Sequence, residues 1–334
     1  MPPPERPSPE EFPLEQSSPA EPSLDRLVAA VRDHAGLRAK RAIGAVRRVV
    51  GASDPLTGPG DDGAVVEMGG GGSVIVCGEA MHPAFLASDP RAAGIAAVLA
   101  NVNDLAAMGA VPRGIVNTVV GPAPVAAEAL QGMAEAADLY DVPIVGGHIS
   151  EHPGEPALSA FAVGDADRVL SVSRARPGQH LVFACCLEGR MRTDFPFFTT
   201  LGHQGPRLAR DVRLLAEAAR MDLAQAAKDV SMAGSIGSLA MLLEPGRLGA
   251  GIDLDELPAP AGVSLDRWLV CFPTYAFWVA TDRPDQCVDL FRSAGLAAAA
   301  VGTVTGSGAL TLRAGGESRR VFDLKSEPIT GLWP

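Results

Sequence analysis

The segment DPRAAGIAAVLANVNDLAAMG, from Asp89 to Gly109, decides how the first half of the chain folds. Asp89 is a typical N-cap residue, Pro90 is favoured at the first position of a helix, and Gly109 is favoured just after the last one. The residues between them are nearly all apolar or small, and a helix that is apolar on every side belongs inside a protein. We therefore predict a buried helix that begins at Pro90 and ends at Gly109.

Two polar side chains interrupt this helix on one face. Asn101 and Asp104 are three residues apart, which makes them neighbours on a helix surface. A buried carboxylate costs free energy unless it is paired, hydrogen-bonded or bound to a metal ion. The pair therefore has two interpretations: a hydrogen-bond network that joins the helix to a loop, or a site for a metal ion or another ligand.

Strands and helices alternate on both sides of this segment. In the first half we expect strands at 64–68, 74–77, 114–120, 143–145 and 157–163, a hairpin turn at 69–72, and helices from residue 24, over 38–50 and over 125–139. After a turn near 176–178 we expect a strand at 180–184 and helices over 208–228, 235–243 and 284–293. This alternation indicates an α/β or α+β protein.

Length and composition indicate two folded domains and one tail. A chain of 334 residues is long enough for two domains of ordinary size. Residues 1–22 are rich in Pro, Glu and Ser, and we expect them to be disordered because they bury too little apolar surface. The first domain is expected over 23–175 and the second over 176–334.

The charge balance argues against a nucleic-acid partner. The chain has 28 Lys and Arg against 39 Asp and Glu, a net charge of −11, and so offers no strongly basic face. The five cysteines form no CxxC pair, and we expect reduced, mostly buried thiols. Neither a membrane span nor a signal peptide is indicated, and we expect a cytoplasmic protein.

The loop GPGDDG, at 58–63, carries two adjacent carboxylates. Mg2+ takes oxygen ligands and is commonly held by one or two carboxylates together with substrate phosphates, so Asp61 and Asp62 suit such a site. The alternative is an exposed turn before a strand. Glu79 follows the next strand, where its carboxylate would emerge at one end of a sheet.

Two further segments suit an anion. Gly146, Gly147 and His148 follow a short apolar strand and either offer backbone N–H groups to a phosphate or form a simple turn. Asp229 precedes SMAGSIG, whose small residues open a helix with unpaired N–H groups. The lysine of a P-loop is missing, so neutralisation of phosphate charge would fall to metal ions and backbone groups, with arginines assisting.

Together these segments resemble the aminoimidazole ribonucleotide (AIR) synthetase superfamily, which includes thiamine-monophosphate kinase, selenide water dikinase and a hydrogenase maturation factor. The resemblance covers about 24–304. It is carried by GDDGAVV at 60–66, NVNDLAAMGAVPRGI at 101–115, GGH at 146–148, KDVSMAGSIGSLAMLLE at 228–244, GAGIDLDELP at 249–258 and LFRSAGLAAAAVGTV at 290–304. The helix with Asn101 and Asp104 is its most specific part.

The resemblance implies a two-domain α/β fold, with an N-terminal mixed sheet and helices, a C-terminal α/β sandwich domain, and a homodimeric assembly. It also implies ATP and Mg2+ as cofactors and transfer of the γ-phosphate to a small-molecule acceptor, sometimes to activate a carbonyl for dehydration. The metal-facing candidates are Asp61, Asp62, Glu79, Asp104 and Asp229. The candidates for holding the nucleotide are Asn101, Asp104, Gly146, Gly147 and His148.

Several departures indicate an orphan branch. Glu79 stands where the superfamily more often has Asp, the kinase's Ser-Asp-Gly is not matched after Asp229, and the reactive cysteines of the dikinase and the maturation factor are missing. The stretch EGRMRTDFPFFTT at 188–200 is also unusual. With Asp229, its Arg192 and Asp194 are our catalytic candidates, and Arg190 would join them in an acceptor pocket.

Three functions therefore remain open. The first is ATP- and Mg2+-dependent phosphotransfer, or phosphate-activated dehydration or ligation, on an unidentified small-molecule acceptor. The second is an activity like that of thiamine-monophosphate kinase. The third is a nucleotide-binding partner subunit without catalysis of its own.

Overall fold

The computed structural model describes residues 22–51, 58–68, 72–193 and 195–333. Most of the expected tail, most of the hairpin turn at 69–72, and Asp194 lie outside the described residues. No helix among the described residues is long and apolar enough to cross a membrane. All five cysteines are free, and burial raises their pKa values.

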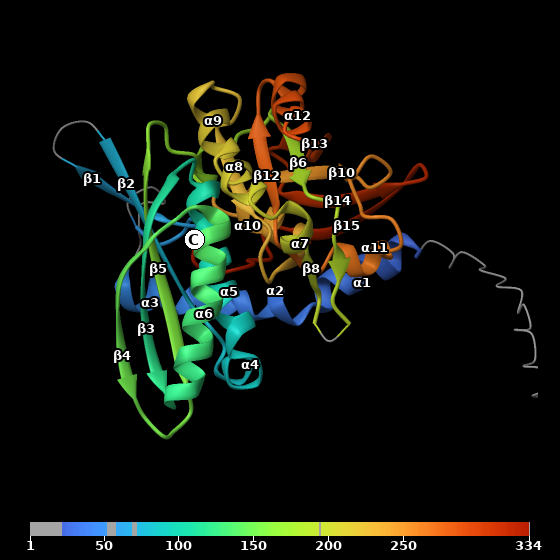
Figure 1. Ribbon diagram of the computed structural model, residues 1–334. Coiled ribbons are helices and arrows are strands. Elements are labelled where there is room, and N and C mark those ends of the chain that lie inside the picture. The colour runs from blue at the N-terminus through green and yellow to red at the C-terminus, as the bar shows by residue number, and fades with distance from the viewer. Residues whose placement is uncertain (1–21, 52–57, 69–71, 194, 334) are drawn as a thin grey trace, which may run out of the picture.

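The described residues form helices and three sheets (Figure 1). The helices are α1 (Leu24–Asp33), α2 (Ala35–Ala39), α3 (Gly44–Val50), α4 (Pro83–Ser88), α5 (Pro90–Ala107), α6 (Ala123–Tyr140), α7 (Leu201–Gln204), α8 (Arg207–Asp211), α9 (Leu214–Arg220), α10 (Gly234–Leu243), α11 (Leu265–Trp268) and α12 (Pro284–Ser293), with 3-10 helices η1 (Lys40–Ile43) and η2 (Val172–Arg174).

The strands fall into a five-stranded, a seven-stranded and a three-stranded sheet. The five-stranded sheet, in the order β1-β2-β5-β3-β4, contains β1 (Ala64–Met68), β2 (Gly72–Ala80), β3 (Val111–Gly121), β4 (Ile144–Glu151) and β5 (Ala157–Ala166). The seven-stranded sheet, in the order β15-β14-β10-β13-β6-β12-β9, contains β6 (His180–Cys185), β9 (Ala226–Asp229), β10 (Gly249–Asp253), β12 (Ala276–Thr281), β13 (Ala297–Thr305), β14 (Ala309–Ala314) and β15 (Glu317–Asp323). The small sheet, in the order β11-β8-β7, contains β7 (Arg190–Met191), β8 (Phe197–Thr199) and β11 (Phe272–Pro273).

Helix α5 forms where the sequence predicts it and lies at the centre of the molecule. The Asp89 carboxylate accepts a hydrogen bond of 3.0 Å from the backbone N–H of Ala92, and Gly109 adopts a φ of +71° just after the helix. Its close contact with α6 depends on glycine, because a Cβ on Gly94 would lie 2.0 Å from the Ala129 carbonyl oxygen. One hydrophobic core joins α5, α6, the inner face of the five-stranded sheet and one face of the seven-stranded sheet.

A second core lies on the other face of the seven-stranded sheet, where α1 and α10 cover it. Phe183 and Trp278 pack against each other there with ring centroids 4.8 Å apart, and the Trp278 indole N–H donates to the Ser235 carbonyl at 2.7 Å. Both sheets are mixed, with helices on their faces, which confirms the two-part α/β architecture expected from the resemblance.

One expected helix is wrong. The segment 208–228 does not form a single helix, because α8 and α9 end at a turn in which Asp222 adopts a φ of +58°. The chain then enters strand β9, which pairs with β12. All four residues of β9 are buried, so its Ala-rich sequence packs in a sheet rather than continuing a helix.

The strand expected at 143–145 is longer than predicted. Strand β4 runs from Ile144 to Glu151 along the edge of its sheet, so the glycine pair lies within the strand rather than beyond its end. Gly146 and Gly147 pair with Val116 and Asn117 of β3. The simple turn considered for this segment is therefore wrong.

The C-terminal segment returns to the loop that contains the acidic pair. The buried Glu244 carboxylate accepts hydrogen bonds from the backbone N–H groups of Ile329 and Thr330, at 2.7 and 3.0 Å, and from the Thr330 hydroxyl at 2.7 Å. Beyond this anchor, the Trp333 ring packs so closely on Gly60 that a Cβ there would lie 2.5 Å from it. Glu244 thus fixes a segment that supports the acidic loop.

We predict that Glu244→Gln lowers the free energy of unfolding by about 1–3 kcal/mol, because an amide replaces a charged acceptor that satisfies several buried donors. Urea denaturation followed by circular dichroism measures this loss. Glu327→Gln is the matched control, since Glu327 makes a partly exposed ion pair with Arg32. Equal stability of the two variants would contradict the anchoring role.

Candidate active site

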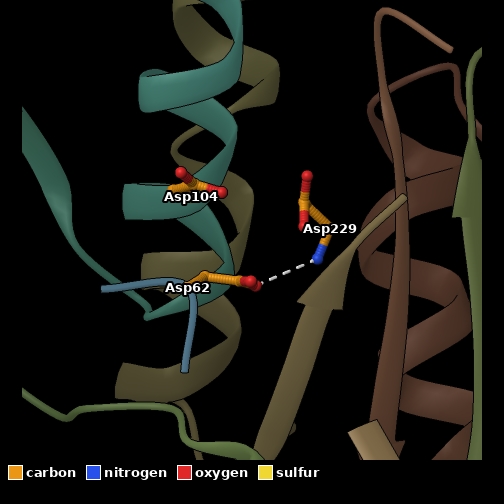
Figure 2. Close-up of side chains that lie close together, drawn as sticks. All are labelled: Asp62, Asp104 and Asp229. Atoms are coloured by element: carbon orange, nitrogen blue, oxygen red, sulfur yellow. Dashed lines mark hydrogen bonds between the residues drawn. The ribbon is translucent and has the colours of Figure 1, made fainter. Parts of the chain in front are cut away.

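Three carboxylates converge where α5, β9 and the loop before β1 meet. One oxygen each of Asp62, Asp104 and Asp229 lie within 4.8 Å of one another. Figure 2 shows the three side chains approaching from a loop, a helix and a strand. The arrangement gathers residues that are far apart in the sequence into a single group of oxygen donors.

Each carboxylate is placed by its own element. Asp104 lies on the buried last part of α5, and Asp229 is the last residue of β9. The Asp62 carboxylate accepts a hydrogen bond of 3.3 Å from the backbone N–H of Asp229, which is the dashed line in Figure 2. This bond ties the loop of the first half of the chain to a strand of the second half.

A lysine that our sequence analysis did not assign to the site lies within the cluster. The Lys228 ammonium group contacts the Asp62 carboxylate and lies 2.6 Å from the Asp229 carboxylate. Its side chain is 7% exposed. Lys228 directly precedes the candidate ligand Asp229 in the sequence. Had β9 been predicted as a buried strand, this neighbour would have indicated a lysine at the site.

Burial dominates the electrostatics of the cluster. It raises the pKa of Asp62 to about 8 against the opposing effect of Lys228, and it raises the pKa of Asp104 well above its ordinary value, with Asp229 and Asp62 adding to the shift. Burial alone would lower the pKa of Lys228, but Asp229 and Asp62 outweigh it and raise that pKa. The raised pKa values of Asp62 and Asp104 mean that burial favours the protonated form of both side chains.

Asp61 and Glu79 differ from the three clustered carboxylates. One oxygen of Asp61 accepts hydrogen bonds from the Ser171 hydroxyl at 2.7 Å and the Val172 N–H at 2.9 Å, so this side chain holds the acidic loop against η2. Burial raises the pKa of Glu79, and Lys40 is the strongest opposing charge. Neither residue belongs to the group within 4.8 Å.

The buried amides of α5 hold the helix in place. The Asn101 side-chain N–H donates to the Ala97 and Ala160 carbonyls at 2.8 and 3.2 Å, which links α5 to β5. Asn103 donates to the Thr274 carbonyl at 3.1 Å and so links α5 to the segment that follows β11. The structure thus places Asn101 in a hydrogen-bond network and Asp104 in the acidic cluster.

The other sequence candidates lie outside the cluster. Gly146, Gly147 and His148 lie on edge strand β4. Arg190 lies on β7, and the backbone of Arg192 joins Phe197 and Arg267. At the start of α10, the N–H groups of Gly234 and Ser235 already donate to the Ser231 and Leu269 carbonyls, which leaves fewer donors for an anion than the sequence suggested.

The cluster can bind a cation. Carboxylate oxygens are the ligands that Mg2+ prefers, and here three of them converge from rigid elements. Among the described residues, no hydrogen bond or ion pair reaches the Asp104 carboxylate, and the residue is 8% exposed. A buried carboxylate without a partner is costly, so the geometry fits a hard divalent cation at this position.

Comparison with known proteins identifies two matching domains and a related protein. Residues 60–166 match the N-terminal domain of AIR synthase related proteins, and residues 203–315 match the C-terminal domain. The chain is 34% identical over 292 residues to an uncharacterised protein of Synechocystis sp., with 86% of this chain and 90% of that protein covered. The first domain match includes Asp62 and Asp104, and the second includes Asp229.

Solved structures show the same fold. T. maritima PurL complexed with ATP matches with a TM-score of 0.73 and 22% identity, covering 92% of this chain and 53% of that chain, so this chain spans about half of PurL. AaThiL complexed with AMPPCP and TMP matches with a TM-score of 0.63 and 18% identity, covering 84% and 96%. The resemblance inferred from the sequence is confirmed, and the chain belongs to the AIR synthase related protein family.

Proposed function

We propose that this protein binds ATP with Mg2+ at the cluster of Asp62, Asp104 and Asp229 and transfers the γ-phosphate to a small-molecule acceptor. The observation that carries the proposal is the convergence of three buried carboxylate oxygens from separate elements. Support comes from the PurL and ThiL structures of the same fold, which hold ATP or AMPPCP. When bound, Mg2+ would neutralise charge on the phosphates during transfer.

The chain's own residues have distinct parts in this proposal. Asp104 and Asp229 present oxygen ligands, while Asp61 and Asn101 hold the loop and helix that carry the site. Positioning of the reactants supplies much of the acceleration in such reactions. Arg190 and Arg192, at the small sheet, are our candidates for contacting the acceptor, by direct phosphotransfer or by phosphate activation before dehydration or ligation.

Two alternative functions can be separated from this one by experiment. An activity like that of thiamine-monophosphate kinase is suggested by the ThiL structure, which contains TMP and shares nearly its full length with this fold. A nucleotide-binding subunit without catalysis would bind ATP and show no turnover. ATP consumption assays with thiamine monophosphate and other acceptors separate the three outcomes.

Asp104→Asn is expected to weaken Mg2+-dependent ATP binding by roughly tenfold to a hundredfold, because an amide is a poorer ligand for Mg2+ than a carboxylate. Isothermal titration with AMPPCP and Mg2+ measures the affinity. Asp289→Asn, on the exposed face of α12, is the matched control and should bind as the wild type does. Unchanged binding by Asp104→Asn would remove the cluster from the proposed site.

Stability should depend on pH through Asp62. Its folded-state pKa of about 8 lies above the ordinary value of 3.8, so its contribution to stability is lost as pH rises toward and through 8. The metal-free protein should therefore lose up to about 1.4 kcal/mol per pH unit for this one proton between pH 6 and 8. Mg2+ should offset the loss, since it binds the ionised carboxylates.

Denaturant unfolding at pH 6 and pH 8, with and without Mg2+, measures this dependence. Asp62→Asn cannot ionise at this position, so its slope with pH should be smaller than that of the wild type. The same slope in both proteins would show that other groups cause the loss.

We also propose that the outer face of the five-stranded sheet pairs with a second copy of the chain. Its inner face is covered by α5 and α6, whereas large apolar side chains remain exposed on β1 to β5. They are Val66, Met68, Val76, Val116, Val145 and Phe161. Contiguous exposed apolar surface of this kind marks an interface, and a groove lined by Val76, Val116 and Phe161 runs along it.

Val116→Arg is expected to convert a dimer into a monomer, because it places an unpaired charge in the centre of that apolar face. Light scattering coupled to size-exclusion chromatography measures the mass. Met221→Arg, an exposed apolar position at the end of α9, is the control and should leave the mass unchanged. A monomeric wild type, or a dimeric Val116→Arg variant, would contradict this pairing.

A further inference from the structure

The chain contains three lysines, and one of them is buried among the carboxylates of the site. Lys325 donates to the Gly306 carbonyl at the surface, and Lys40 is half-buried on η1. Lys228 differs from both because its ammonium group lies between Asp62 and Asp229. A buried ammonium group requires compensating charges, and here the carboxylates of Asp62 and Asp229 provide them.

The contacts of Lys228 divide the cluster into two parts. One oxygen of Asp62 and one oxygen of Asp229 face the ammonium group, and the other oxygen of Asp62 accepts the Asp229 backbone N–H. The Asp104 carboxylate belongs to the same cluster and has no hydrogen bond or ion pair among the described residues. A cation of the chain already lies between Asp62 and Asp229, whereas no cation of the described residues contacts Asp104.

We propose that Lys228 acts as a built-in cation of the nucleotide site and takes the place of one divalent metal ion. With Lys228 present, the cluster then binds one divalent ion fewer than it would bind without this lysine. The divalent ion that it does bind lies at Asp104. A second divalent ion between Asp62 and Asp229 is excluded by the ammonium group, which occupies the same oxygen atoms and repels it. This inference rests on the proposed function for the identity of the site.

The role differs from that of a purely structural ion pair in one measurable way. A structural lysine, once removed, leaves a less stable protein with the same number of metal ions. A lysine that replaces a metal ion leaves a vacant cation position lined by carboxylates, which a divalent ion can then fill. Metal stoichiometry therefore separates the two roles without any measurement of activity.

The test uses Mn2+ as the probe and counts bound ions per chain by electron paramagnetic resonance of the free ion at pH 7.5, without nucleotide. Lys228→Met removes the charge and keeps a side chain of similar length, and Lys325→Met is the matched control. We expect Lys228→Met to bind one more Mn2+ per chain than the wild type, and Lys325→Met to bind the same number as the wild type. An equal count in Lys228→Met and the wild type overturns the proposal.

Two further measurements keep the test decisive. If Lys228→Met does not fold, Lys228→Gln keeps an amide donor toward the carboxylates, and the same comparison of counts applies to it. In the wild type itself, two or more Mn2+ ions that are both lost in Asp104→Asn would also overturn the proposal. Failure of AMPPCP to bind the wild type would instead overturn the proposed function, and it would leave the Mn2+ counts to decide the role of Lys228.

Discussion

The burial of negative charge beside α5 is the constraint on which the rest of the structure depends. Asp62, Asp104 and Asp229 share a region where water is largely excluded, and Lys228 supplies one positive charge to it. Charges in such surroundings must be compensated by partners that are held firmly in place. The fold meets this requirement by bringing a loop, a helix and a strand from both halves of the chain to one point (Figure 2).

The buried charges keep their partners because α5, which carries Asp104, is held by contacts on several sides. Its apolar surface is shared with both large sheets in a single core, and Gly94 of α5 and Gly132 of α6 allow the two helices to approach closely. Its two buried asparagines bond to carbonyl groups of β5 and of the segment that follows β11. Asp61 and the C-terminal segment hold the acidic loop from the other side. Residues outside the cluster therefore determine its geometry.

The sequence predicted the parts of this arrangement that depend on local pattern. The α5 helix was visible from its caps and apolar composition, and Asp104 stood out because a carboxylate is costly inside such a helix. The break after α9 was missed, because the Ala-rich segment around 222–228 favours a helix locally and only pairing with β12 makes it a strand. Lys228 was missed for the same reason, since a lysine in a long amphipathic helix would point to solvent. Asp61 and Asp62 have different hydrogen-bond partners, Ser171 and Asp229, which are distant in the sequence. The local sequence therefore could not predict that the two side chains differ in role.

The places where local rules fail are also the places where function is proposed. A strand that buries a lysine and an aspartate, and a helix that buries an aspartate without a partner, lower the stability of the metal-free fold. Such an arrangement is tolerated when a ligand that binds only the folded state restores the lost free energy. Lys228 contacts two of the clustered carboxylates, and under the proposed function a divalent ion at Asp104 would supply further positive charge. Lys228 is one cation among three clustered carboxylates, so the proposed function assigns the remaining charge neutralisation to a cation bound together with the nucleotide phosphates.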